Sequence, residues 1–177
     1  MTLAYGIDPS TFTGIVGLDE QGNVIEQVEL VLENGIDSTT EEIWDYATDI
    51  VNLVPVSSVV ALEGFSFGSK GQGVSTQFGI GFAIRFQLLQ KNIKVYEPTP
   101  TQVKKFATGK GNVNKEAMVL PIYKHWDFEH DSNNVRDAFV LAQIARSSLT
   151  GTTKAKYQEE ALKTILAGPK PKTKKRK

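Results

Sequence analysis

The sequence contains no cysteine and only two histidines among its 177 residues. Without cysteine there is no disulfide and no thiolate metal site, and two histidines supply a zinc site poorly. Aspartate and glutamate, in contrast, number twenty. Any metal site is therefore expected to bind a hard cation through oxygen ligands.

Long apolar runs are also missing. No stretch of about 18 apolar residues is present, which is the length that a membrane-spanning helix needs, and no basic segment followed by an apolar one forms a leader. We therefore expect no contact with a membrane, no secretion and a cytoplasmic location. With 40% hydrophobic side chains the chain can bury one core, so one domain with appendages is expected.

The formal net charge is zero, but the two signs are unevenly distributed. Residues 170–177 read KPKTKKRK and hold six of the twenty basic residues, which leaves fourteen basic against twenty acidic residues upstream. Proline, glycine and lysine from residue 168 onward cannot bury apolar surface, so residues 168–177 are predicted to form a disordered basic tail. Such a tail favours sequence-independent contact with nucleic-acid phosphates, and a merely solubilising extension is the alternative.

Apolar patterns and their breaks predict alternating strands and helices. The predicted strands span residues 3–7, 14–18, 24–31, 59–63 and 93–96. The predicted helices comprise one that starts at residues 38–40 and ends before Pro55, and others over residues 74–90, 102–107, 115–126, 134–149 and 157–166. Short links between the first three strands imply an antiparallel meander, and the strand, helix, strand succession after them implies a parallel crossover. The predicted fold class is α/β, a mixed sheet of five strands, three antiparallel and two parallel, with helices on both faces.

Three acidic residues lie where an apolar element meets a break. Asp8 and Glu63 end short apolar runs, and Asp137 opens a helix whose next turns are almost wholly apolar. Asp8 would lie on the first strand and Glu63 at the carboxyl end of the fourth, which can be its immediate neighbour. Burying an ionised carboxylate costs several kcal/mol unless a cation or hydrogen bonds compensate it. The trio suggests a divalent-metal site. The alternative is that Asp8 and Glu63 are only capping or turn acids, and GIDPS does fit an Asx turn.

Four stretches of the sequence together resemble a known family. GIDPSTFTG, ALEGFSFGSKG, YEPTPTQVKKFATGKGNVNKEAM and NNVRDAFVLA occur in this order over roughly residues 3–148. They resemble the RuvC-type Holliday junction resolvases, especially their phage members, within the ribonuclease H-like superfamily. The resemblance implies a ribonuclease H-like nuclease domain over residues 1–150, followed by a helical extension at 151–167 and the basic tail. A phage member would work in the cytoplasm of a bacterial host.

The resemblance also implies a set of site residues. Asp8, Glu63 and Asp137 match the metal-binding acids of the family, Asp137 being the last residue of its DxxD pattern. The first position of that pattern is Asn134 here, whose amide oxygen can bind a hard cation but brings no charge. Asp131, about one turn earlier, is the reserve for that charge. We expect these residues to hold two Mg²⁺ or Mn²⁺ ions, which catalyse phosphodiester hydrolysis when about 3.5 to 4 Å apart.

Aromatic and basic residues near these acids predict contacts with DNA. Phe65, Phe67 and Lys70 follow Glu63 in a glycine-rich loop, where aromatic rings can stack on exposed bases. The alternative is that this loop packs onto its own domain. The loop lacks the GK[ST] ending of a nucleotide-binding P-loop, so no nucleotide cofactor is expected.

A second group of candidates for DNA phosphates lies between residues 104 and 115. The group consists of Lys105, Lys110 and Lys115, with Lys104 beside them. For Lys104 and Lys105 a solvated helix face is the alternative interpretation.

The helix over residues 74–90 is apolar on more than one face, which favours a homodimer. Gly79 and Gly81 cost about 1 kcal/mol each relative to alanine within a helix, and small residues there would let another backbone approach closely. A fully buried central helix in a monomer is the alternative.

We therefore predict a homodimeric, Mg²⁺ or Mn²⁺-dependent endonuclease that makes paired nicks in Holliday junctions and other branched DNA. A noncatalytic junction-binding protein and a less selective ribonuclease H-like branch or flap nuclease are the alternatives. Actin-like and sugar-kinase ATPases also begin with a strand, an aspartate and a Gly/Thr-rich turn. Their fold needs two such domains, for which this chain is too short.

Overall fold

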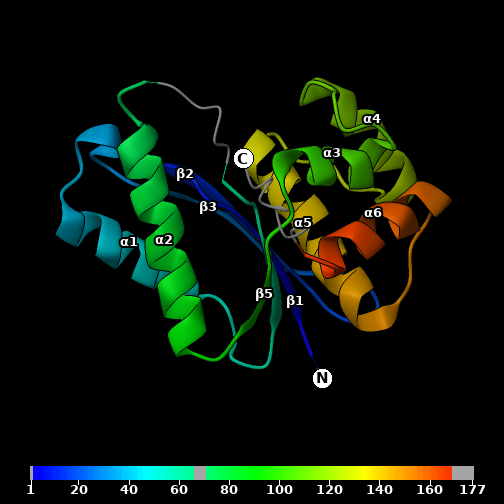
Figure 1. Ribbon diagram of the computed structural model, residues 1–177, viewed down its shortest axis with the longest axis horizontal. Coiled ribbons are helices and arrows are strands. Elements are labelled where there is room, and N and C mark those ends of the chain that lie inside the picture. Colours follow the sequence, from blue (N-terminus) through cyan, green and yellow to red (C-terminus); the bar gives the residue numbers. More distant parts are fainter. Residues whose placement is uncertain (1, 66–70, 169–177) are drawn as a thin grey trace, which may run out of the picture.

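The central element is a mixed five-stranded sheet, as predicted (Figure 1). The computed structural model describes residues 2–65 and 71–168. The strands are β1 (Ala4–Asp8), β2 (Phe12–Leu18), β3 (Val24–Val31), β4 (Val59–Leu62) and β5 (Lys94–Tyr96), in the order β3-β2-β1-β4-β5. β1 pairs antiparallel with β2 and parallel with β4, so the meander and the crossover meet at β1.

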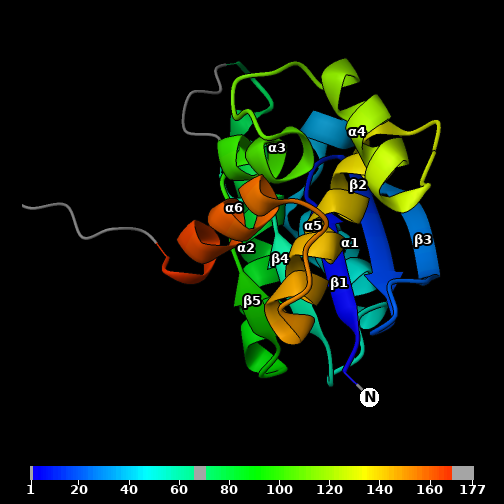
Figure 2. The ribbon, with the colours of Figure 1, turned by 90° about the vertical axis from the view of Figure 1, so that its right-hand side faces the viewer.

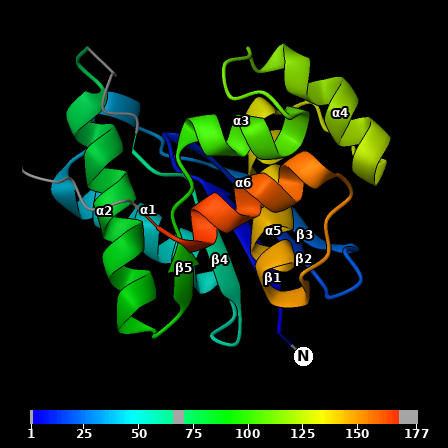
Figure 3. The same ribbon diagram turned by 45° about the vertical axis from the view of Figure 1, so that its right-hand side comes forward.

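Helices cover both faces of the sheet. They are α1 (Thr40–Asn52), α2 (Val74–Gln90), α3 (Pro100–Thr108), α4 (Glu116–Trp126), α5 (Asn133–Thr150) and α6 (Lys156–Leu166), with a short 3-10 helix η1 (Gly35–Asp37) before α1. α1 and α2 lie on one face, and α5 lies on the other with α3, α4 and α6 around it (Figures 1 and 3). Each face has its own buried apolar cluster. The α/β class and every predicted helix are confirmed.

Local sequence signals fix several helix starts. The Thr39 hydroxyl accepts the amide of Glu42 while the Glu42 carboxylate accepts the amide of Thr39, a capping box that begins α1. Thr99 and Gln102 form the same arrangement at α3. At α5 the Ser132 hydroxyl accepts the amides of Asn134 and Val135, which positions the first turn of the helix that carries Asp137.

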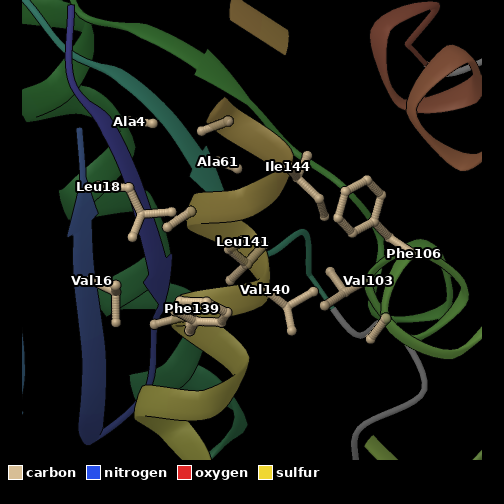
Figure 4. Packing of buried hydrophobic residues seen from close by; sticks show 14 of the residues in the cluster. Ala4, Val16, Leu18, Ala61, Val103, Phe106, Phe139, Val140, Leu141 and Ile144 are labelled. Atoms are coloured by element: carbon tan, nitrogen blue, oxygen red, sulfur yellow. The ribbon is translucent and has the colours of Figure 1, made fainter. Parts of the chain in front are cut away.

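Two strand glycines let α5 pack directly onto the sheet. A Cβ added to Gly6 would lie 2.0 Å from the Ala138 carbonyl oxygen, and one added to Gly14 would lie 2.1 Å from the Asn134 carbonyl oxygen. Both distances are far below van der Waals contact, so only glycine allows this approach. α5 crosses in front of β1 and β2 (Figure 2), and Figure 4 shows Phe139 and Leu141 among the side chains of this packed layer. The close approach brings the first turns of α5 next to the end of β1.

On the opposite face of the sheet, helix α2 is buried on one side and exposed on the other. Ile80, Ile84 and Leu88 of α2 are fully buried against the sheet and α1. Phe86 and Leu89 are 55% and 70% exposed, so α2 is not a fully buried central helix, and that alternative is wrong. None of the helices within residues 2–65 and 71–168 combines the length and hydropathy needed to cross a bilayer.

Candidate active site

The three predicted acids meet at the carboxyl ends of the two central parallel strands. Asp8 is the last residue of β1, and Glu63 directly follows β4, with its amide donating to the Ile7 carbonyl at 3.1 Å. Asp137 comes from the second turn of α5. Asp8 and Asp137 are each only 7% exposed. Residues separated by more than a hundred positions in the sequence therefore share one small buried region.

Lys115 lies among these acids. Its Nζ is 2.6 Å from Asp137 Oδ2 and 4.0 Å from Asp8 Oδ2, while its side chain is 46% exposed. Lys115 immediately precedes α4, so the segment between α3 and α4 reaches the end of β1. Of the four lysines between residues 104 and 115, Lys115 is the one with an ion pair to the acids. Lys104 also acts on the site, because its charge opposes the burial and the neighbouring carboxylates that raise the pKa of Glu63.

The electrostatics show that the acids are crowded. Burial and the charge of Asp137, opposed by the charge of Lys115, together raise the pKa of Asp8 to about 7. Burial, followed by the charges of Asp8 and Asp137, raises the pKa of Glu63 to about 8. Burial disfavours the Lys115 ammonium, but its hydrogen bond to Asp137 and the charges of Asp8 and Glu63 raise its pKa overall. The carboxylates thus require more positive charge than one lysine supplies.

The chemistry of these donors fits a hard divalent cation. Asp8, Glu63 and Asp137 offer carboxylate oxygens, which Mg²⁺ and Mn²⁺ prefer. Within the described ranges, no three acidic or histidine side chains already enclose a common metal position, and the Lys115 ammonium contacts two of the acids instead. Metal binding would therefore require Lys115 to withdraw and the carboxylates to converge.

Asn134 is held by a residue that the sequence did not single out. Its Nδ2 donates to Glu29 Oε1 at 2.8 Å, and the Ser132 hydroxyl donates to the same oxygen at 2.6 Å. These two hydrogen bonds lower the pKa of Glu29. In the sheet register Asp8 pairs with Gly14 and Gly14 pairs with Glu29, so an acid on β3 shares a row with Asp8. Only the strand register, which the sequence does not reveal, could have identified Glu29.

The reserve acid Asp131 is exposed just before α5. Its backbone carbonyl accepts Arg136 Nη1 at 3.3 Å. In the described part of the chain, no hydrogen bond or ion pair joins its side chain to Asn134 or Lys115. The role of Asp131 stays a prediction, as does a metal-binding role for the Asn134 oxygen.

The predicted DNA-contacting residues are distributed unevenly around the acids. Phe65 is half-buried, with its ring 4.8 Å from Phe78 and 4.7 Å from Phe82 of α2. This packing matches the alternative in which the loop contacts its own domain. Phe67 and Lys70 lie outside the described residues, as does the basic tail beyond Gly168.

The other two predicted phosphate contacts, Lys105 and Lys110, differ in exposure. Lys105 is half-buried in the last turn of α3, and Lys110 is exposed just after that helix. No ion pair involves either of them within residues 2–65 and 71–168. Their contact with DNA stays a prediction.

A five-stranded mixed sheet of this order, with a late helix bringing an acid to the end of the first strand, defines a ribonuclease H-like fold. Among solved structures, the chain is similar to RuvC of T. thermophilus in complex with a Holliday junction substrate. The identity is 18% and the TM-score 0.63, over 87% of this chain and 99% of that chain. A structure of Thermus thermophilus RuvC matches with 20% identity and a TM-score of 0.58, over 86% and 98% of the two chains. No protein-family model matches the sequence, and no curated protein is significantly similar to it. The similarity establishes a RuvC-type fold.

Proposed function

We propose that this protein is a divalent-metal-dependent endonuclease that resolves Holliday junctions and related branched DNA. The observation that carries the proposal is the buried cluster of Asp8, Glu63 and Asp137 at the ends of β1 and β4. The raised pKa values of Asp8 and Glu63 indicate a site that lacks positive charge. The fold in which this cluster occurs is shared with a RuvC structure that holds a Holliday junction substrate.

In the proposed mechanism, Asp8, Glu63 and Asp137 hold the metal, with the Asn134 amide oxygen as a further ligand. Two Mg²⁺ or Mn²⁺ ions bound there would supply an activated water and stabilise the charge that develops on the phosphate. Burial excludes bulk water around Asp8 and Asp137 and strengthens the electrostatic interactions within the site. Lys115, half-exposed at the edge of the cluster, compensates part of the negative charge of Asp8 and Asp137 in the metal-free protein. Once displaced, its ammonium is placed to contact a phosphate oxygen.

The proposed partners are branched DNA and a second copy of the chain. We propose Lys105, Lys110 and Lys115 as phosphate contacts, with Phe67 and Lys70 as further contacts to the junction. The exposed side of α2 supports a homodimer, because Phe82 and Phe86 line a hollow of about 550 Å³ between α1 and α2 together with Trp44. Two copies would place two sites on a two-fold symmetric junction and so allow paired nicks.

Noncatalytic junction binding is the second candidate. It is favoured by Asn134, whose amide group is hydrogen-bonded to Glu29 and adds no negative charge to the cluster. A protein of this kind would bind a four-way junction but leave its strands intact.

Cleavage of a labelled immobile four-way junction, compared with matched linear duplex in Mg²⁺, Mn²⁺ or EDTA, tests the proposal. The wild type should nick the junction in a metal-dependent way, and Glu63→Gln should abolish nicking while junction binding is retained or tightened. The variant removes a metal ligand together with a negative charge that repels phosphate. Tight binding without cleavage in any metal would establish the noncatalytic alternative, and cleavage by Glu63→Gln at the wild-type rate would refute the role of Glu63.

A further inference from the structure

Arg85 of α2 joins the loop that carries Glu63 to the body of the protein. Its Nη2 donates to the Glu63 carbonyl at 2.9 Å, its Nη1 donates to the Gly81 carbonyl at 2.8 Å, and its Nε pairs with Glu97 Oε2 at 2.6 Å. The guanidinium carbon also lies 4.1 Å from the centroid of the Phe65 ring. With only 11% of its side chain exposed, Arg85 is a buried connection among three segments of the chain.

The contacts match the particular chemistry of arginine. All three guanidinium nitrogens have an acceptor, and the flat face of the group is covered by an aromatic ring. A planar fork of donors can satisfy this arrangement, whereas the compact ammonium of lysine cannot reach all of these acceptors at once. The ion pair with Glu97 compensates the cost of burying the charge.

These contacts fix the backbone on both sides of the Glu63 side chain. The amide of Glu63 is bound to the Ile7 carbonyl in β1, and its carbonyl is bound to Arg85. The next amide, that of Gly64, donates to the Pro98 carbonyl at 2.8 Å. Of these three anchors, Arg85 is the one provided by a side chain, so it can be removed by substitution without changing the loop itself.

Gly81 makes room for this arrangement. A Cβ at Gly81 would lie 2.5 Å from Phe65 Cε1 and 3.1 Å from Arg85 Nη1. The space beside this helix glycine is thus filled by Phe65 and Arg85 of the same chain. The expectation that Gly81 serves the approach of another backbone is therefore wrong, whereas Gly79 meets only Ile43 at an ordinary distance of 3.7 Å.

We propose that Arg85 is a positioning residue for Glu63. It holds the Glu63 peptide and the Phe65 ring so that the carboxylate stays beside Asp8 and Asp137, from where it can converge with them on a metal ion. The inference rests on the proposed nuclease function for its catalytic consequence, but the placement of the loop can be measured independently of cleavage.

The test compares Arg85→Gln and Arg85→Lys with wild type, using Arg146→Gln as a matched control. Arg146 also lies on a helix and donates its Nε to a backbone carbonyl, that of Glu20 at 2.9 Å, but it lies about two and a half helical turns beyond Asp137 on α5. Three quantities are measured: hydrogen exchange of the Gly64 amide, Mn²⁺ affinity, and kcat and KM for junction cleavage normalised to the folded fraction.

In Arg85→Gln the Gly64 amide should exchange faster, Mn²⁺ should bind more weakly, and kcat should fall about 100-fold with KM unchanged, the effect of a misplacement of about 1 Å. Arg85→Lys keeps the charge over Phe65 and should recover part of each loss, while Arg146→Gln should match wild type in all three. Global destabilisation would instead affect amides throughout the chain and would not change the Mn²⁺ affinity of the folded molecules.

The inference would be overturned if Arg85→Gln had the same Gly64 exchange rate, the same Mn²⁺ affinity and the same kcat as wild type. If Arg85→Gln does not fold, Arg85→Lys decides by the same three measurements. If the wild type itself cleaves no junction, the proposed function fails, yet exchange and Mn²⁺ binding still decide whether Arg85 positions Glu63. Faster exchange with weaker Mn²⁺ binding would support that role, and unchanged values would overturn it.

Discussion

Gly14→Ala should disturb both the stability of the protein and the geometry of the site. The added Cβ would lie 2.1 Å from the Asn134 carbonyl oxygen and 2.3 Å from its carbon, where ordinary contact begins at 3.4 Å. The first turn of α5 must therefore move away from β2 by more than 1 Å. Backbone atoms cannot rotate away as a flexible side chain can, so the whole helix end is expected to shift.

The expected cost is about 3 kcal/mol, the upper part of the range for overpacking a well-filled core. For a chain of this size each kcal/mol lowers the melting temperature by about 2–4 °C, so a fall of about 6–12 °C is expected. Because Asp137 moves with the helix, kcat for junction cleavage should also fall by about 100-fold in the fraction that remains folded.

Differential scanning calorimetry and single-turnover cleavage measure the two effects. Gly79→Ala is the matched control, because its Cβ would meet only Ile43 side-chain atoms at 3.7 Å and beyond. In that helix position alanine should be neutral or stabilising by up to about 1 kcal/mol. A Gly14→Ala protein with the melting temperature and kcat of wild type would refute the close contact between α5 and β2.

The remaining predictions concern charge and assembly. The pKa of Asp8 is raised to about 7 and that of Glu63 to about 8, so the folded protein binds a proton at each of these carboxyl groups more tightly than the unfolded chain does. The free energy of unfolding in EDTA should therefore decrease as the pH rises from about 4.5 to about 8. The decrease should be smaller in Glu63→Gln, and equal thermal melting profiles for the two proteins would contradict the assignment. Lys115→Ala should have a lower melting temperature than wild type in EDTA but the same melting temperature in Mn²⁺, because the metal replaces the missing positive charge. An equally lowered melting temperature in both conditions would contradict the replacement of Lys115 by metal. Phe86→Asp should shift sedimentation from dimer to monomer. The control Val56→Asp, at a residue that is 70% exposed, should leave sedimentation unchanged. A monomeric wild type would exclude the proposed dimer.

Much of the fold followed from local sequence patterns. Apolar runs ended by breakers located the five strands, and short connections distinguished the antiparallel meander from the parallel crossover. The same reasoning brought Asp8 and Glu63 together, since parallel neighbouring strands end at the same edge of a sheet. Asp137 could be included because a carboxylate at the start of an apolar helix needs compensation when that helix is buried.

Other parts of the site depend on contacts between distant segments. Lys115 was one of several lysines with similar local sequence, and only the path from α3 to α4 distinguishes it from Lys110. Glu29 is significant because strand register aligns it with Asp8. The local sequence does not distinguish Arg85, since its partners Glu63 and Glu97 lie twenty-two residues before it and twelve after it.

The late position of α5 in the chain also has a consequence for biosynthesis. The apolar face of β1, β2 and β4 is buried by a helix that begins only at Asn133. A nascent chain that has not yet released this helix from the ribosome exposes half of the core, and it carries two of the three clustered carboxylates. Domains generally fold as units during synthesis, so we expect the body of this protein to fold late and fragments that end before α5 to aggregate.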